Sequence, residues 1–135
     1  MTKTLDEEGS AAVEFALVAP ILLLILMGIV SAGIYLATML AVSNTAMEAA
    51  RATIPGMTVA ERRTLATARA DTMLSAYEPF LVESEATVVA DPAGTNAFSV
   101  QITYKMDRFA GARLAGVIGL PKEITRTAVV ANGGY

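Results

Sequence analysis

Hydrophobic positions are concentrated in one uninterrupted run near the N-terminus. No residue between Glu14 and Glu48 carries a charge, and residues 21–29 are almost entirely Leu, Ile and Met. As a helix these 33 residues would be about 50 Å long, whereas the hydrocarbon core of a bilayer is about 30 Å thick. We therefore predict one long helix over residues 10–54 that includes a transmembrane segment and continues beyond the membrane.

The composition of this helix changes near its middle. From Ser31 onward the sequence is richer in Ala, Ser, Thr and Gly than the Leu-rich stretch before it. Gly33, Ala37 and Ala41 are spaced four residues apart, so they lie near one helix face, and small residues at this spacing let helices approach closely. We predict a helix-packing surface there, although Ala and Gly are also common in membrane helices that lack one.

A proline interrupts the same pattern. Pro20 has no backbone N–H to donate, and its ring clashes with the preceding turn, which predicts a kink or local opening of the helix. Membrane helices tolerate such a residue because neighbouring groups satisfy the freed carbonyl.

The remaining residues, 57–135, predict a small α+β head. Thr58 and Glu61 have the spacing of a capping box, and Pro79 would end the helix that follows. Apolar residues then recur at helical spacing, namely Ala66, Ala70, Met73, Leu74 and Tyr77.

Three segments of the head have the pattern of strands. They are residues 86–90, 98–104 and 124–130, with turn residues at 91–95 and a Gly-punctuated apolar segment at 109–120. We predict an antiparallel sheet of about three strands. A head of this size without disulfides has a marginal core, so we expect the second half of the long helix to complete its packing.

The amino-acid composition argues against several classes of function. The chain has no His and no Cys, which removes the commonest zinc ligands, His bases, Cys nucleophiles and disulfides. A net charge of −3 argues against nucleic acid as a partner. We therefore expect no enzyme, no cofactor and no metal site. We interpret Arg62 and Arg63 as an exposed helix face, and Glu83 and Glu85 as solvated charges at strand spacing.

The most informative motif precedes the apolar run. Gly9 is followed by small residues, then by Glu14 and Phe15. An ionisable residue at a membrane segment is costly and usually has a partner. Cleavage after Gly9 would give Ser10 a positive α-amine, which would pair with the Glu14 carboxylate of its own or an adjacent subunit. Alternatively, Glu14 marks the aqueous boundary of an ordinary signal anchor.

Residues 9–24 resemble the N-terminus of the TadE/TadG-like proteins, minor pseudopilins of the tight-adherence (Tad, Flp-type) pilus system. The resemblance implies a prepilin-type leader at residues 1–9, cut by prepilin peptidase between Gly9 and Ser10. It gives Glu14 and Phe15 a role in recognition or assembly. It also implies a single-pass protein of the bacterial inner membrane whose head, residues 57–135, is exported.

The implied partners are prepilin peptidase, other Tad pilus subunits and inner-membrane assembly proteins. The acidic leader gives little support for a cytoplasmic N-terminus, so the orientation follows from the resemblance and not from charge.

Two other interpretations remain. One is a single-pass envelope protein whose head binds some other partner. The other is a secreted protein cleaved near Ser31, Ala32 and Gly33, which have the small side chains of a signal-peptidase site. Against secretion, the apolar stretch before this site is longer than the usual apolar region of a signal peptide, the leader is acidic, and apolar residues continue beyond the site.

Overall fold

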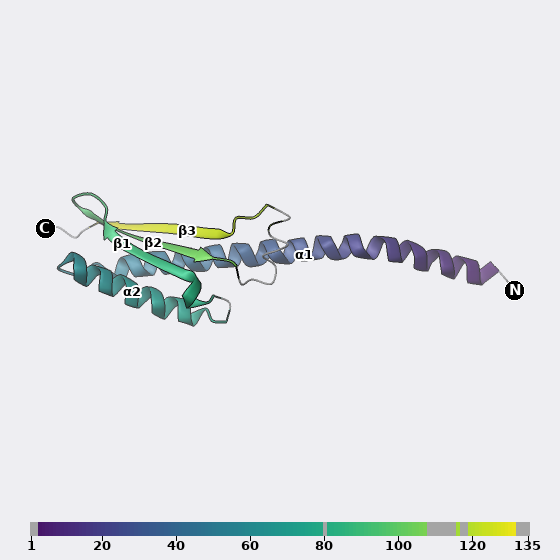
Figure 1. Ribbon diagram of the computed structural model, residues 1–135, viewed down its shortest axis with the longest axis horizontal. Coiled ribbons are helices and arrows are strands. Elements are labelled where there is room, and N and C mark those ends of the chain that lie inside the picture. Colours follow the sequence, from purple (N-terminus) through teal and green to yellow (C-terminus); the bar gives the residue numbers. More distant parts are fainter. Residues whose placement is uncertain (1–2, 80, 108–115, 117–118, 132–135) are drawn as a thin grey trace.

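The computed structural model describes residues 3–79, 81–107, 116 and 119–131. Its elements are α1 (Lys3–Ala52), α2 (Val59–Ala76), the 3₁₀ helix η1 (Glu83–Glu85), β1 (Ala86–Pro92), β2 (Ala97–Lys105) and β3 (Glu123–Ala131). Figure 1 shows α1 extending as a stalk from a head in which α2 and the sheet lie beside its C-terminal half. The predicted α+β fold is confirmed.

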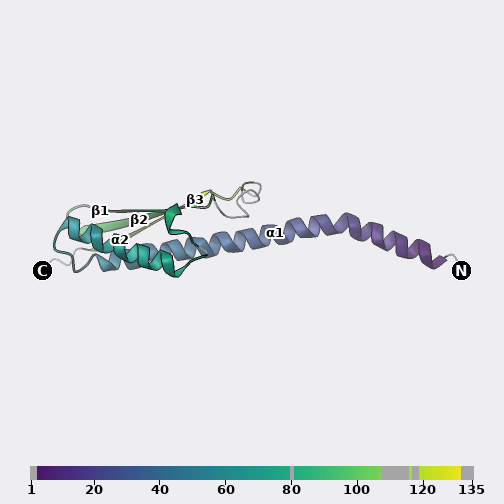
Figure 2. The same cartoon turned by 60° about the horizontal axis from the view of Figure 1, so that its bottom comes forward.

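The helix α1 is longer at its start than the sequence pattern predicts. It begins at Lys3, within the predicted leader, and ends at Ala52 instead of residue 54. Helical structure continues through Pro20, and Figure 2 shows that α1 bends in its N-terminal part, drawn in purple. A kink centred on Pro20 stays a prediction.

The start of α2 has the hydrogen bonds of a modified capping box. The Thr58 hydroxyl accepts a hydrogen bond from the Glu61 N–H at 3.2 Å. The Glu61 carboxylate accepts one from the Met57 N–H at 2.9 Å, one residue before the usual partner. The predicted apolar face is confirmed, since Ala66, Ala70 and Leu74 are buried and Met73 and Tyr77 are half-buried.

The sheet is antiparallel, in the order β1-β2-β3. Side chains of the central strand alternate, so that Phe98, Val100, Ile102 and Tyr104 are buried while Gln101 is exposed on the other face. The three predicted strands are therefore confirmed. Most of the predicted apolar segment at 109–120 lies outside the described residues.

Glu83 and Glu85 lie in the 3₁₀ helix η1, just before β1, and not in a strand. Glu83 is exposed as predicted, and Glu85 is half-buried. The chain turns here, because the Glu85 N–H donates to the Val82 carbonyl at 3.0 Å before β1 begins. The sequence around Glu83 and Glu85 has alternating charges and few apolar residues, so it gave no local signal for this turn.

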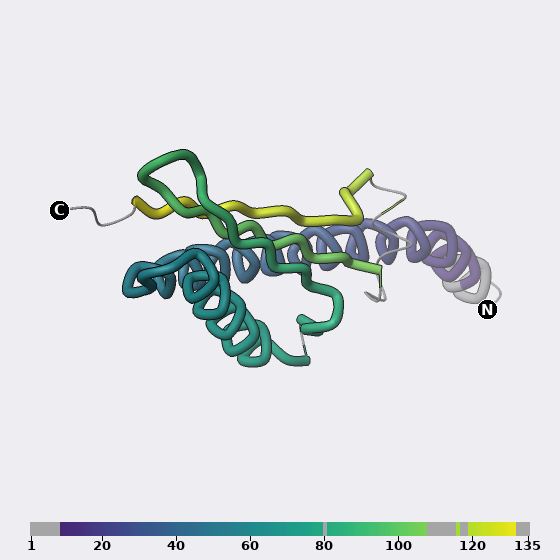
Figure 3. Tube along the Cα trace, turned by 60° about the vertical axis from the view of Figure 1, so that its left-hand side comes forward, coloured from purple at the N-terminus to yellow at the C-terminus, as the bar shows by residue number. Residues whose placement is uncertain are grey.

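The second half of α1 supplies a large part of the core, as predicted. It lies with α2 on one face of the sheet, and α1 contacts α2, β2 and β3 (Figures 1 and 3). Most of the buried core residues come from α1 (Ala41, Val42, Ala46, Ala49, Ala50), from α2 (Ala66, Ala70, Leu74) and from β2 (Phe98, Val100, Ile102, Tyr104), and the others are Leu81, Ala90, Met106 and Ile124. Small side chains at the helix contact allow the two helices to lie close together.

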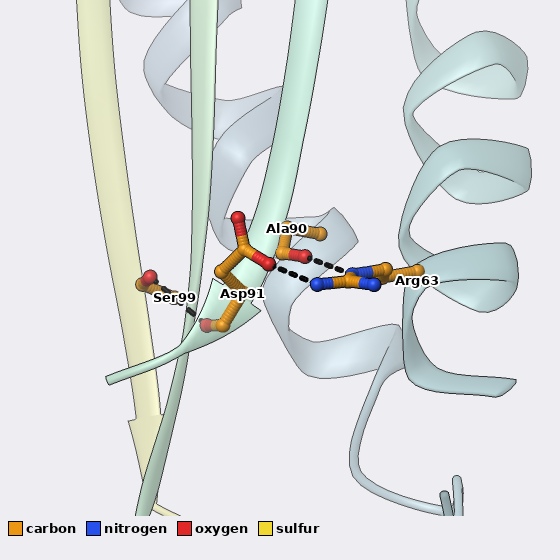
Figure 4. A network of polar contacts seen from close by, with 4 residues as sticks. All are labelled: Arg63, Ala90, Asp91 and Ser99. Atoms are coloured by element: carbon orange, nitrogen blue, oxygen red, sulfur yellow. Dashed lines mark hydrogen bonds and ion pairs between the residues drawn. The ribbon is translucent and has the colours of Figure 1, made fainter. Parts of the chain in front are cut away.

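The interpretation of Arg62 and Arg63 as an exposed helix face holds for Arg63, which is exposed, whereas Arg62 is half-buried. Arg62 donates from Nε to the Gly56 carbonyl at 2.8 Å, and its guanidinium lies 5.8 Å from the centre of the Phe98 ring. Arg63 donates to the Ala90 carbonyl at 3.1 Å and also binds the Asp91 carboxylate (Figure 4). The two arginines thus tie α2 to the preceding loop and to the sheet.

A matched pair of substitutions on α2 tests this packing. Ala70→Leu places a larger side chain in the fully buried contact and should lower the free energy of unfolding by about 1–3 kcal/mol. Ala68→Leu, two residues away on the exposed side, should change it by no more than about 0.5 kcal/mol.

The measurement is pulse proteolysis of the full chain in detergent micelles over a urea series. Equal effects of the two substitutions would contradict the packing of α2 described above.

Candidate functional site

The candidate site is α1, whose two halves have different surroundings. From Val13 to Val30 the large apolar side chains are more than half exposed, and the first buried residue is Ser31. Residues 10–30 span about 31 Å as a helix, close to the hydrocarbon thickness of about 30 Å. The free part of α1 therefore has the length of one membrane crossing, and the head covers the excess.

In the part of the chain that the structure describes, α1 is the one helix long and apolar enough to cross a membrane. Its apolar side chains point outward on every side before Ser31, where a buried core helix would have neighbours. This exposure is compatible with a single-pass membrane anchor.

The Gly9–Phe15 motif lies on this free part. Gly9, Ser10, Glu14 and Phe15 are all helical and exposed, and Phe15 is 70% exposed. A Cβ atom added to Gly9 would meet nothing within 4 Å, so packing within the chain does not require a glycine there. A need for glycine at position 9 would therefore come from a contact with another molecule and not from packing within the chain.

Glu14 has no ion-pair partner among the side chains that the structure describes. It lies where the uncharged run begins, so a membrane around that run would bring its carboxylate next to lipid. A carboxylate beside lipid is costly unless a group of opposite charge lies nearby.

The three predicted helix-packing residues do not share one environment. Gly33 and Ala37 are exposed, whereas Ala41 is 9% exposed and belongs to the core. A Cβ atom at Gly33 would have open space around it. The head reaches α1 on the side of Ala41, so Gly33 and Ala37 stay available to another molecule and their packing role stays a prediction.

The sequence interpretation missed a groove of about 390 Å³ between α1 and α2. Within it the Glu48 carboxylate lies 3.6 Å from an Arg51 guanidinium nitrogen and 3.3 Å from one of Arg69. The Glu48–Arg51 spacing was visible in the sequence, but Arg69 arrives from the other helix. These exposed ion pairs contribute little to stability and instead give the groove a polar end.

No group of three His, Cys, Asp or Glu side chains among the described residues is arranged to hold a metal ion. The buried side-chain polar atoms described also all have hydrogen-bond partners, so none points unpaired into a cavity.

Comparison with known proteins agrees with the motif. The family model for TadE-like proteins matches residues 9–51, which includes the Gly9–Phe15 motif and nearly all of α1. This match confirms the resemblance and extends it into the head-covered half of the helix. No curated protein and no solved structure matches the chain significantly.

The division of α1 predicts where a thiol would be protected by lipid. The chain has no cysteine, so Leu24→Cys and Met57→Cys each introduce a single thiol. In membrane vesicles permeabilised to expose both aqueous sides, the thiol at position 24 should be protected from a hydrophilic maleimide. The thiol at position 57, where the native side chain is 90% exposed at the head, should react.

Full labelling of both variants after denaturation in SDS is the control. Equal labelling rates of the two thiols in the permeabilised vesicles, before SDS is added, would contradict a membrane crossing at residues 10–30.

Proposed function

We propose that this Tad pilus-associated chain is a minor pilin-like (pseudopilin) subunit that assembles through α1. The single observation that carries the proposal is the Gly9–Phe15 motif, exposed on a membrane-length helix that matches the TadE-like family. In this proposal the chain works by assembly and is not an enzyme.

The precursor would be inserted in the inner membrane by residues 10–30, with its head on the periplasmic side. Prepilin peptidase would then cut between Gly9 and Ser10 and remove the leader. Gly9 and Ser10 are exposed on α1, which supports access of a protease to this position.

Cleavage would change the electrostatics at the start of α1. Ser10 and Glu14 are four residues apart, and helical side chains lean toward the N-terminus, so the carboxylate lies over the turn where the new amine forms. The shortened helix would also begin close to Glu14, where its dipole stabilises an anion. The processed end is therefore nearly self-neutralised and suited to a position at the membrane or between subunits.

Assembly would then replace lipid around residues 10–30 by the helices of other pilus subunits, and Phe15 would take part in that contact. The head would remain outside and make lateral contacts. A single-pass envelope protein with a different partner would share the anchor but would need neither cleavage nor an unpaired Glu14.

The cleavage site is tested with two glycine substitutions in the same helix. Gly9→Leu should block processing, because a bulky side chain would occupy the position before the scissile bond. Gly28→Leu is the matched control, since a Cβ atom there also meets nothing within 4 Å, and it should be processed normally.

Intact-mass analysis of protein from cells with and without prepilin peptidase measures the result. The native chain should begin at Ser10 only when the peptidase is present. Normal maturation of the Gly9→Leu chain would exclude cleavage after Gly9, and a start near Ile34 would favour secretion.

The role of Glu14 is tested by Glu14→Gln, which keeps the size of the side chain and removes its charge. Loss of one charge-assisted contact should reduce incorporation into pili by about tenfold or more. Glu83→Gln, at an exposed position of the head, is the control and should assemble normally. Immunoblots of sheared pili, compared with the total processed protein, separate assembly from maturation, and unchanged incorporation would refute the docking role.

A further inference from the structure

Beyond the membrane-length segment, one face of α1 stays uncovered by the head. The exposed residues between positions 31 and 51 are Gly33, Leu36, Ala37, Leu40, Asn44, Met47 and Arg51. No residue of this face before Arg51 is charged, and Leu40 is 61% exposed. Helix faces in water normally carry charged side chains, so this face is composed for contact with something other than water.

Six of these residues have the spacing of a coiled coil. Gly33, Ala37, Leu40, Asn44, Met47 and Arg51 follow one another at alternating intervals of four and three. This 3.5-residue repeat places Gly33, Leu40 and Met47 at d positions and Ala37, Asn44 and Arg51 at a positions. We call residues 33–47 of this series the seam.

The repeat continues backward into the membrane-length segment. Leu23 and Val30 extend the a positions, and Leu26 extends the d positions, and all three are more than half exposed. The seam alone covers only about two heptads, fewer than the roughly three to four that mark an independent coiled coil. It therefore needs the membrane segment beside it, and the two form one continuous surface on α1.

We propose that a second copy of this chain packs on the seam, parallel and in register. Two copies inserted by the same single span point in the same direction, which brings identical residues opposite each other. Asn44 would face Asn44 of the second copy, and a single buried Asn at an a position is a known device for fixing the register of parallel dimers. No like charges meet along the seam, because the first charged residues follow Met47.

The surroundings of the seam are also compatible with a second copy of the chain. At its C-terminal end, the groove between α1 and α2 is lined by Asn44 and Met47 on one side and by Met73 and Tyr77 on the other. Side chains of a neighbouring α1 would enter this groove beside α2. Arg51, which would face its own copy at the next a position, lies 3.6 Å from the Glu48 carboxylate, which it shares with Arg69. The dimer rests on insertion of α1 in one orientation and not on cleavage or on a role in pili.

Single-cysteine variants test the proposal, since the native chain has no thiol. Leu40→Cys and Asn44→Cys lie on the seam. Leu36→Cys, also exposed on α1 but beside the seam, and Ala68→Cys, exposed on α2, are matched controls. The full, uncleaved chain is reconstituted alone in liposomes at a high lipid-to-protein ratio and oxidised. Disulfide dimers should form at least about tenfold faster at positions 40 and 44, where facing Cα atoms come within bonding range.

A second substitution checks that the seam itself holds the dimer. Met47→Glu in the Leu40→Cys chain would bring two carboxylates together and should slow cross-linking about tenfold, whereas Met57→Glu at the exposed end of the head should not. Equal rates at positions 36, 40 and 68 would overturn the proposal. So would cross-links that form only when another pilus protein is added, because the seam would then bind a different chain.

Discussion

The packing of the second half of α1 against α2 and the sheet is the contact on which the rest of the structure depends. The sheet has one apolar face, and α2 alone covers only the part near β1, whereas α1 contacts β2 and β3. Ala46, Ala49 and Ala50 are almost completely buried at this contact. Because their side chains are small, the helix axis can lie close to its neighbours, and a bulkier segment would separate the two layers.

The same contact explains why the uncharged run can be longer than a membrane is thick. Buried threonines of α1 do not need polar partners from the head, since the hydroxyls of Thr38 and Thr45 each donate to the helix carbonyl four residues earlier at 2.9 Å. The head therefore accepts an uncharged helix without unsatisfied polar groups. Nothing interrupts the helix between Val30 and Ser31, so the anchor and the core of the head are one continuous element.

Local patterns predicted most of this fold because their causes are local. The Thr58 cap, the spacing of the apolar residues on α2 and the alternation in β2 each depend on neighbouring residues alone. The contacts that these patterns missed involve partners that are far away in the sequence. Arg63 binds Asp91, 28 residues later, and the Arg62 guanidinium lies 5.8 Å from the ring centre of Phe98 on β2. Neither contact has a signal in a window of the sequence.

The residues of the candidate site could be predicted only in part. Glu14 could be selected because a charged residue is unusual beside an apolar run, whereas the roles of Gly9 and Phe15 came from the family resemblance, and the structure shows all three exposed on α1. The spacing of Gly33, Ala37 and Ala41 predicted one shared face but could not say which side the head would occupy. Only the packed head separates Ala41, which is buried, from the two residues that stay open.

That separation gives α1 three different surfaces along one helix. Residues 15–30 are apolar on all sides, and from Ser31 onward one side meets the head while the other stays open and uncharged as far as Met47. An apolar surface of this kind is unfavourable in water and favourable against another helix. Because the open side continues directly into the lipid-facing segment, a neighbouring helix that crosses the same membrane can cover both without turning. One long helix, α1, thus lies both in the membrane-length segment and in the core of the head. The same helix therefore favours association with partners that are inserted in the membrane in parallel.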